Sequence, residues 1–248
     1  MHIRYLGHSC FLLEFSQANV LIDPGFGCEN FHSYKRILPS LVKPENLPRI
    51  SLILITNELE DHFDKAAIEF LCNRDGACVV AHDSVLSELD IPPRCKRAAA
   101  VASKLHLRGI QINVQTAHYP RSFYPMAYMV TGDGVAIYHA GDTELLEEFP
   151  DELNPHVALL PIGGGNLTMD IVDAVKATKM LKPEVVIPMH YNTFSLIQAS
   201  PEEFAKKIEK SNLRTKPVIL NPNEAIEFLP ESTVPPLSGK PENYSFSR

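Results

Sequence analysis

Acidic and imidazole side chains follow several apolar runs of this sequence, at the points where those runs end. The run at residues 51–55 leads into a polar loop that contains Asp61 and His62, and later apolar runs lead to Asp142 and His190. Aspartate and histidine are frequent ligands of divalent transition metals, which activate water for attack on a carbonyl or phosphoryl group. Serine-based hydrolysis is less well supported, because Ser9 has no recognisable triad partners.

The hydrophobic pattern predicts the elements that must position these side chains. Strand-like runs at residues 3–6, 10–15 and 20–23 are separated by turns and predict a hairpin arrangement. The continuous apolar run at residues 52–56 predicts a central strand that is covered on both faces. Further strands are predicted at residues 77–81, 110–114, 127–130, 135–138, 157–160, 185–188, 218–220 and 225–229. Helices are predicted at residues 65–73, 171–181 and 201–211.

Two strand-rich halves, each with attached helices, predict an α+β fold. In this arrangement two mixed sheets pack face to face, and the helices cover their outer faces. We expect residues 1–230 to form one such domain. Residues 231–248 are rich in proline and serine, and we expect them to form a C-terminal tail.

Six short stretches between residues 6 and 194 occur in an order that is found in one protein family. They are Leu6-Gly7-His8-Ser9, Leu21-Ile22-Asp23-Pro24, Tyr138-His139-Ala140-Gly141-Asp142-Thr143, Pro161-Ile162-Gly163-Gly164, Thr168-Met169-Asp170 and Ile187-Pro188-Met189-His190-Tyr191-Asn192-Thr193-Phe194. With them the chain resembles the metallo-β-lactamase superfamily. Within it, the chain is most similar to the small metal-dependent hydrolases related to L-ascorbate-6-phosphate lactonase. The resemblance implies an αββα sandwich.

The resemblance also implies two sets of metal ligands. The first site would use residues 57, 59 and 118 with Asp142 as a bridge, but the His-x-His-x-Asp-His motif is degenerate here, since Asn57 and Leu59 replace its two histidines. The second site would use Asp61, His62, Asp142 and His190, and this set is intact. We therefore expect one divalent transition metal. Zn²⁺ suits two imidazoles and two carboxylates, and Mn²⁺, Fe²⁺ or Ni²⁺ are alternatives.

Roles for the site residues follow from the resemblance and from the reduced number of ligands. Asp61 or Asp142 would orient or deprotonate the attacking water. His118 would remain beside the metal as a site residue and would act as an acid or stabilise developing negative charge. Four further residues are expected to hold a ligand or to contact the substrate: His8, Asp23, Asn57 and Tyr191. Of these, Asp23 is expected to hold the loop that contains Asp61 and His62 in place through hydrogen bonds. This loop, residues 56–62, is called the metal loop below.

Two alternatives remain open at this point. Glu58 and Glu60 flank the Leu59 position, so a shift of the loop by one residue would bring a carboxylate towards a metal. The leading functional hypothesis is a hydrolase that acts on a small ester, lactone or phosphoester with a single metal. The alternative is a catalytically degenerate protein of the same fold that binds or senses a small ligand.

Composition limits the partners and the compartment. The chain has 248 residues and a net charge of −7, which opposes nonspecific binding to nucleic acid. No apolar stretch approaches the length of about 20 residues that a membrane span requires, and the N-terminus carries no secretory signal, so we expect a cytoplasmic protein with no membrane partner. The five cysteines form no C-x-x-C pair and are expected to be reduced. A small anionic or ester-like substrate is expected, and a homo-oligomer is possible.

Overall fold

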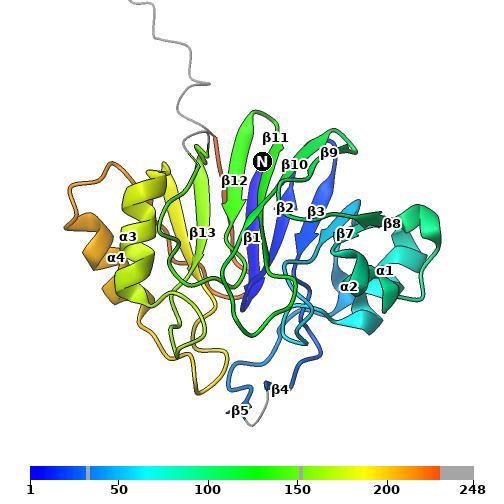
Figure 1. Ribbon diagram of the computed structural model, residues 1–248, viewed down its shortest axis with the longest axis horizontal. Helices are drawn as coiled ribbons and strands as arrows, with labels where there is room; N and C mark the ends of the chain where they lie inside the picture. The colour runs from blue at the N-terminus through cyan, green and yellow to red at the C-terminus, as the bar shows by residue number, and fades with distance from the viewer. Residues whose placement is uncertain (32–33, 151–152, 230–248) are drawn as a thin grey trace, which may run out of the picture.

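The computed structural model describes residues 1–31, 34–150 and 153–229, and the predicted tail at 231–248 lies outside these ranges. Two seven-stranded mixed sheets form the centre of the molecule, and four α-helices lie on the outside (Figure 1). This arrangement confirms the predicted α+β sandwich. Among the described residues, no helix is long and apolar enough to cross a membrane.

The first sheet combines antiparallel and parallel pairing. In spatial order it contains β16 (Ala225–Glu227), β1 (His2–Gly7), β2 (Cys10–Glu14), β3 (Asn19–Ile22), β6 (Leu52–Leu54), β7 (Cys78–Ala81) and β8 (Lys96–Ala98). Pairing is antiparallel from β16 to β3 and parallel from β3 to β8. Because β1, β3 and β6 run in the same direction, their carboxyl ends meet at one edge of the sheet.

The second sheet has the same combination of pairings. It contains β15 (Lys216–Pro217), β14 (Val185–Met189), β13 (Val157–Pro161), β12 (Val135–His139), β11 (Met126–Gly132), β10 (Ile110–Thr116) and β9 (Lys104–Leu107). The pairs from β15 to β12 are parallel and those from β12 to β9 are antiparallel. The carboxyl ends of β10, β12 and β14 therefore also share one edge.

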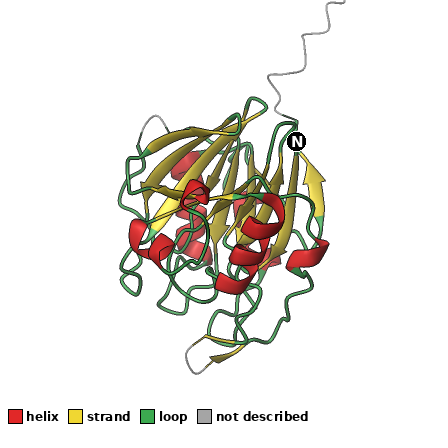
Figure 2. Ribbon diagram, turned by 90° about the vertical axis from the view of Figure 1, so that its right-hand side faces the viewer, coloured by secondary structure: helices red, strands yellow, loops and turns green. Residues whose placement is uncertain are grey.

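Alternation along the central strands explains why they are apolar on both faces. Leu52 and Leu54 of β6 belong to the main core between the sheets, whereas Ile53 belongs to a second core that includes Ile68 and Leu71 of α1. Figure 2 shows the helices in front of the strands on this side of the molecule. A strand buried on both faces needs a continuous apolar run, which is the pattern that predicted β6.

The helices begin and end at residues suited to those positions. They are α1 (Lys65–Asp75), α2 (Asp83–Ser87), α3 (Ile171–Leu181) and α4 (Pro201–Glu209), with two 3₁₀ turns at Pro44–Asn46 and Pro93–Cys95. The Asp64 side chain accepts a hydrogen bond from the Ala67 N–H at the start of α1, and Gly76 ends the helix in the left-handed conformation. Asp170 caps α3 in the same way through the Asp173 N–H.

Most predicted elements agree with the structure, with differences at the edges of the sheets. The strand predicted at residues 218–220 is instead the short β15 at Lys216–Pro217, and α4 ends at Glu209 rather than at residue 211. The helix α2 and the edge strands β8 and β9 were not predicted as separate elements. A small antiparallel pair, β4 (Asn30–Phe31) and β5 (Tyr34–Lys35), lies below the sheets in Figure 1. All five cysteines are free and buried.

Candidate metal centre

The candidate site lies where the strand ends of both sheets meet. His8 follows β1, the loop with Asp61 and His62 follows β6, Asp142 follows β12, and His190 follows β14. Backbone hydrogen bonds join the two sides: the His190 N–H donates to the His8 carbonyl at 2.9 Å, and the Met126 N–H donates to the Thr56 carbonyl at 2.8 Å. Carboxyl ends of parallel strands are a common place for binding sites, because their loops converge there.

Four side chains bring possible metal ligands to one point. Ligand atoms of His8, Asp61, His62 and His190 lie within 4.8 Å of one another, and all four residues are buried. The structure thus brings together Asp61, His62 and His190, which the sequence analysis assigned to the metal. It also brings in His8, which had been placed only beside a ligand or substrate.

Asp142 completes this set, which is called the donor group below. Its Oδ2 lies 3.0 Å from Nε2 of His62, and its Oδ1 lies 3.1 Å from Nε2 of His190. These four atoms are buried, and none of them has a hydrogen-bond partner of acceptable geometry. Buried polar atoms are rarely left in this state unless an ion or water satisfies them.

The spacing of the donor group fits a divalent metal. Ligand atoms of a tetrahedral zinc ion lie about 2.0–2.2 Å from the metal and hence about 3.3–3.6 Å from one another. The approaches of 3.0 and 3.1 Å to Asp142 and the 4.0 Å separation of His62 Nε2 from Asp61 Oδ2 bracket that range. Two carboxylates and three imidazoles are also the ligand types that Zn²⁺ and its neighbours in the series accept.

Asp23 fixes the orientation of the metal loop. Its Oδ2 lies 2.8 Å from Nδ1 of His62 and accepts a hydrogen bond from the Thr56 hydroxyl at 2.6 Å, while its Oδ1 accepts one from the Thr56 N–H at 2.8 Å. A carboxylate on Nδ1 fixes the tautomer of a histidine and leaves Nε2 free for a metal. Asp23 therefore contacts the loop through hydrogen bonds and holds His62 towards the donor group.

The burial of three acidic residues around imidazoles sets the charge of the site. Burial alone would raise the pKa of Asp142, but His190 and His62 hold that pKa well below its usual value. Burial alone would lower the pKa of His62, but Asp142, Asp23 and Asp61 raise it well above its usual value. Burial, with His190 second, lowers the pKa of His8 to about 4 despite its contact with Asp61. The environment is thus anionic and selects for a cation.

Three residues of the site have unusual backbone φ angles. His8, Asp23 and His190 all have positive φ angles, of 57°, 49° and 54°. Such angles cost energy for residues other than glycine and occur where the surrounding structure enforces them. The phenol of Tyr5 supplies part of this constraint, since it donates to the His8 carbonyl at 3.0 Å, and the His8 and His190 rings lie 4.2 Å apart.

The metal loop packs closely against Gly25, a residue without a side chain. A Cβ atom added to Gly25 would lie 1.8 Å from the carbonyl oxygen of Asp61, which is far inside any permitted contact. The segment after β3 and the loop after β6 therefore pack backbone against backbone at this point. A similar approach occurs at Gly163, whose Cβ would lie 2.2 Å from the carbonyl oxygen of His190.

Asn57 and Leu59, which replace the two histidines of the motif, have other roles. The Asn57 side chain is buried, and its Oδ1 accepts a hydrogen bond from the Leu59 N–H at 3.0 Å, so it shapes the loop. Leu59 packs against an apolar cluster beside the donor group. This apolar cluster consists of Cys28, Tyr119, Leu167, Phe194 and Ile197, with Tyr34, Leu59 and Leu196 packed against it.

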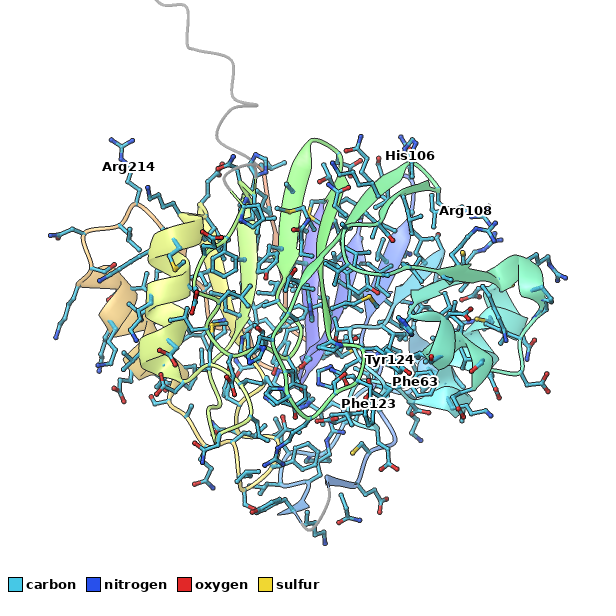
Figure 3. All side chains as sticks on the ribbon, in the orientation of Figure 1. Phe63, His106, Arg108, Phe123, Tyr124 and Arg214 are labelled. Carbon is cyan, nitrogen blue, oxygen red and sulfur yellow. The ribbon has the colours of Figure 1, made fainter. Side chains whose placement is uncertain are left out.

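Glu58 is held away from the donor group. Its carboxylate accepts hydrogen bonds from the Ser122 hydroxyl at 2.7 Å and from the Phe123 N–H at 2.8 Å, and Glu60 is exposed. The alternative in which Glu58 reaches a metal is therefore not supported by this conformation. Figure 3 shows Phe123, Tyr124 and Phe63 close to one another, right of centre in the view.

The structure does not bring His118 to the donor group. Its side chain is 63% exposed, and its Nε2 lies 3.7 Å from the carboxylate of Glu144, which is also at the surface. The next residue, Tyr119, is buried instead. The expected use of His118 as a metal ligand or acid thus has no support in this arrangement, because the chain turns the neighbouring side chain inward.

Tyr191 also lies apart from the donors. It is partly buried and lines a cavity of about 680 Å³ together with Tyr5 and residues 198–202 at the start of α4. Burial raises the pKa of its phenol to about 12. The expectation that Tyr191 holds a ligand or contacts the substrate therefore stays a prediction.

Comparison with known proteins defines the family. A family model described as a β-lactamase superfamily domain matches residues 2–190. A protein of Thermofilum pendens named UPF0173 metal-dependent hydrolase is 37% identical over 238 residues, covering 91% of this chain and 98% of that protein. A protein of the same name from Archaeoglobus fulgidus is 36% identical over 246 residues, covering 92% and 99%.

Solved structures agree with this assignment. Igni18, described as a novel metallo hydrolase from Ignicoccus hospitalis, is 32% identical with a TM-score of 0.77, and the match covers 92% of this chain and all of that one. An isothiocyanate hydrolase from Delia radicum gut bacteria has a TM-score of 0.76 at 17% identity over 92% and 99% of the chains, which shows a shared fold. The protein belongs to the metallo-β-lactamase superfamily. Both of these relatives carry the name metal-dependent hydrolase.

Proposed function

We propose that the protein is a metal-dependent hydrolase that uses a single metal ion to cleave a small ester, lactone or phosphoester. The main support is the donor group, in which the Nε2 atoms of His62 and His190 and both oxygens of Asp142 are buried, close together and without hydrogen-bond partners. The names of the relatives support the general class of reaction. The relation to the lactonase branch remains a prediction.

Asp61, His62, Asp142 and His190 would hold the metal, with His8 as a further nearby nitrogen. When bound, such an ion acts as a Lewis acid and makes water a nucleophile near neutral pH. Zn²⁺ suits this donor set best, with Mn²⁺, Fe²⁺ and Ni²⁺ as alternatives. A second ion is disfavoured because Asn57 bonds to its own loop, Leu59 has no ligand atom, and His118 faces solvent.

Of the two candidate bases, Asp61 suits the role better. One of its oxygens, Oδ2, lies 3.1 Å from Nε2 of His8, while Oδ1 is buried and has no partner. Both oxygens of Asp142, in contrast, face imidazole nitrogens. Asp61 Oδ1 can therefore orient the attacking water and accept its proton, and His8 holds the carboxylate in place.

The test combines metal analysis with turnover. We expect protein purified without chelator to contain about one ion per chain and to hydrolyse p-nitrophenyl acetate, bis(p-nitrophenyl) phosphate or a simple lactone only while that ion is present. Asp61→Ala and His190→Ala should each lower turnover by about 100-fold or more and should each lower the metal content. His106→Ala is the matched control, because His106 is exposed on the edge strand β9, at the top of the molecule in Figure 3.

Two results would contradict the proposal. Unchanged metal content and turnover in both variants would remove the donor group from the reaction. Thermal stabilisation by a small ligand without formation of product would instead favour a protein that binds or senses that ligand.

A further inference from the structure

We infer that Tyr119 is a catalytic residue of this site: its phenol donates a hydrogen bond to the substrate oxygen that gains negative charge during attack by water. The inference rests on the proposed hydrolytic function and adds a residue that none of the comparisons assigns.

Hydrogen bonds of His118, the residue before Tyr119, join this part of the chain to the segment that follows Asp142. The His118 N–H donates to the Thr143 hydroxyl at 2.9 Å, and the Glu144 N–H donates to the His118 carbonyl at 2.8 Å. Since Thr143 directly follows Asp142, these two bonds place Tyr119 next to one of the carboxylates of the donor group.

The opposite side of the Tyr119 turn is fastened to the metal loop. The Ser122 N–H donates to the Tyr119 carbonyl at 3.0 Å, and the Glu58 carboxylate holds both Ser122 and Phe123. Glu58 lies in the same loop as Asp61. Tyr119 is therefore positioned between the two loops that carry Asp61 and Asp142.

The Tyr119 side chain is buried, yet its hydroxyl has no partner. Only 2% of the residue is exposed, and the hydroxyl makes no hydrogen bond within the described structure. Leaving a buried hydroxyl unpaired is costly, so such a group calls for a partner, such as a ligand or a water. The ring packs in the apolar cluster that also contains Phe194, whose ring lies 5.5 Å from that of His8.

The charges around Tyr119 favour a neutral phenol. Burial raises the pKa of this phenol, and the carboxylates of Asp142 and Asp61 raise it further. The hydroxyl thus keeps its proton at neutral pH and can donate a hydrogen bond to an anionic or polarised oxygen. Leu59 in the same apolar cluster supplies no such group, whereas the buried Tyr119 phenol has a free proton to donate.

Tyr119→Phe removes only the hydroxyl, and Tyr138→Phe provides a matched control. Tyr138 is also fully buried with an unpaired hydroxyl, but its ring packs against Phe149, and burial alone, without a charged neighbour, raises the pKa of its phenol. We expect Tyr119→Phe to lower kcat by about 10²–10³-fold, as for loss of one donor to a developing oxyanion. Its KM, metal content and unfolding midpoint should change little, and Tyr138→Phe should retain wild-type kcat.

A binding measurement tests the same hydroxyl without turnover. Inorganic phosphate, titrated calorimetrically into the metal-loaded proteins, should bind Tyr119→Phe about 10-fold more weakly than wild type or Tyr138→Phe. Equal phosphate affinity and equal kcat in the two variants would overturn the role of Tyr119 and leave the proposed hydrolase function intact. If wild type hydrolyses none of the three probes, the proposed activity on them fails, and the phosphate titration alone decides whether Tyr119 binds an anion.

Discussion

The two parts of the metal loop make different interactions. On one side, Asp61 and His62 join buried, unpaired donors from both sheets. On the other side, Leu59 packs against the apolar cluster, and Asn57 bonds to the backbone of its own loop. The comparison shows that the loop can keep its intact ligands in place without the first two histidines, because hydrogen bonds and apolar packing fix the part that a metal would otherwise hold.

Restoring the lost histidines is the most severe test of this comparison. The double change Asn57→His and Leu59→His breaks the bond to the Leu59 N–H and places a polar ring in the apolar cluster, so we expect the free energy of unfolding to fall by about 2–4 kcal/mol. Metal content should remain near about one ion per chain, because two nitrogens without His118 make an incomplete site. Urea denaturation and elemental analysis measure the two quantities.

The control for this change is Leu196→His, which disturbs the same apolar cluster outside the ligand positions. We expect it to destabilise the protein and to leave the metal content unchanged. A count of two ions in the double variant would show that His118 can turn inward and that the vacant half of the motif still forms a site.

Weakening the support of His62 tests the other side of the loop. Asp23→Asn replaces the carboxylate that faces Nδ1 of His62 at 2.8 Å, and we expect the affinity for Zn²⁺ to fall by about 10–100-fold. Competition with a chromophoric chelator measures this affinity. Asp75→Asn serves as the control, because Asp75 also accepts a backbone hydrogen bond, from Ile50, but lies outside the site. If both variants bind Zn²⁺ as wild type does, Asp23 does not support the metal.

Releasing the turn that carries Tyr119 should have the smallest effect. Glu58→Gln keeps the size of the side chain but can no longer accept with both oxygens from Ser122 and Phe123, so we expect a loss of stability of at most about 1 kcal/mol. Turnover should fall by about 2–5-fold as the turn loosens. The exposed Glu60→Gln variant is the control, and identical turnover in the two variants would show that this clamp has no effect on the site.

The sequence predicted the fold well because the strongest signals were also the most local ones. The continuous apolar run that became β6 and the capped helix at Ile171–Leu181 each carry their structure in a few adjacent residues. The edge elements β8 and β15 are only two or three residues long, so a pattern of apolar residues has too few positions to reveal them.

The donors Asp61, His62, Asp142 and His190 could be named from the sequence, since their motifs keep the family order, whereas Tyr119 could not. Alternation along β10 buries Ile110, Ile112 and Val114, and continuing it would place residue 118 inward. The pattern changes at Thr116, the last residue of the strand, which is exposed, so that residues 117 and 119 are buried and residue 118 is exposed. Nothing local records this change, because it depends on hydrogen bonds to Thr143 and Glu144.

Gly25 supplies no metal ligand, yet its close contact with the Asp61 carbonyl makes it part of the construction of the site. Any larger residue there would collide with that carbonyl and displace the chain that bears Asp61 and His62. Metal binding thus depends on the missing side chain of Gly25 as well as on the side chains that supply oxygen and nitrogen ligands. Redesign of this centre for another metal would have to leave that place empty.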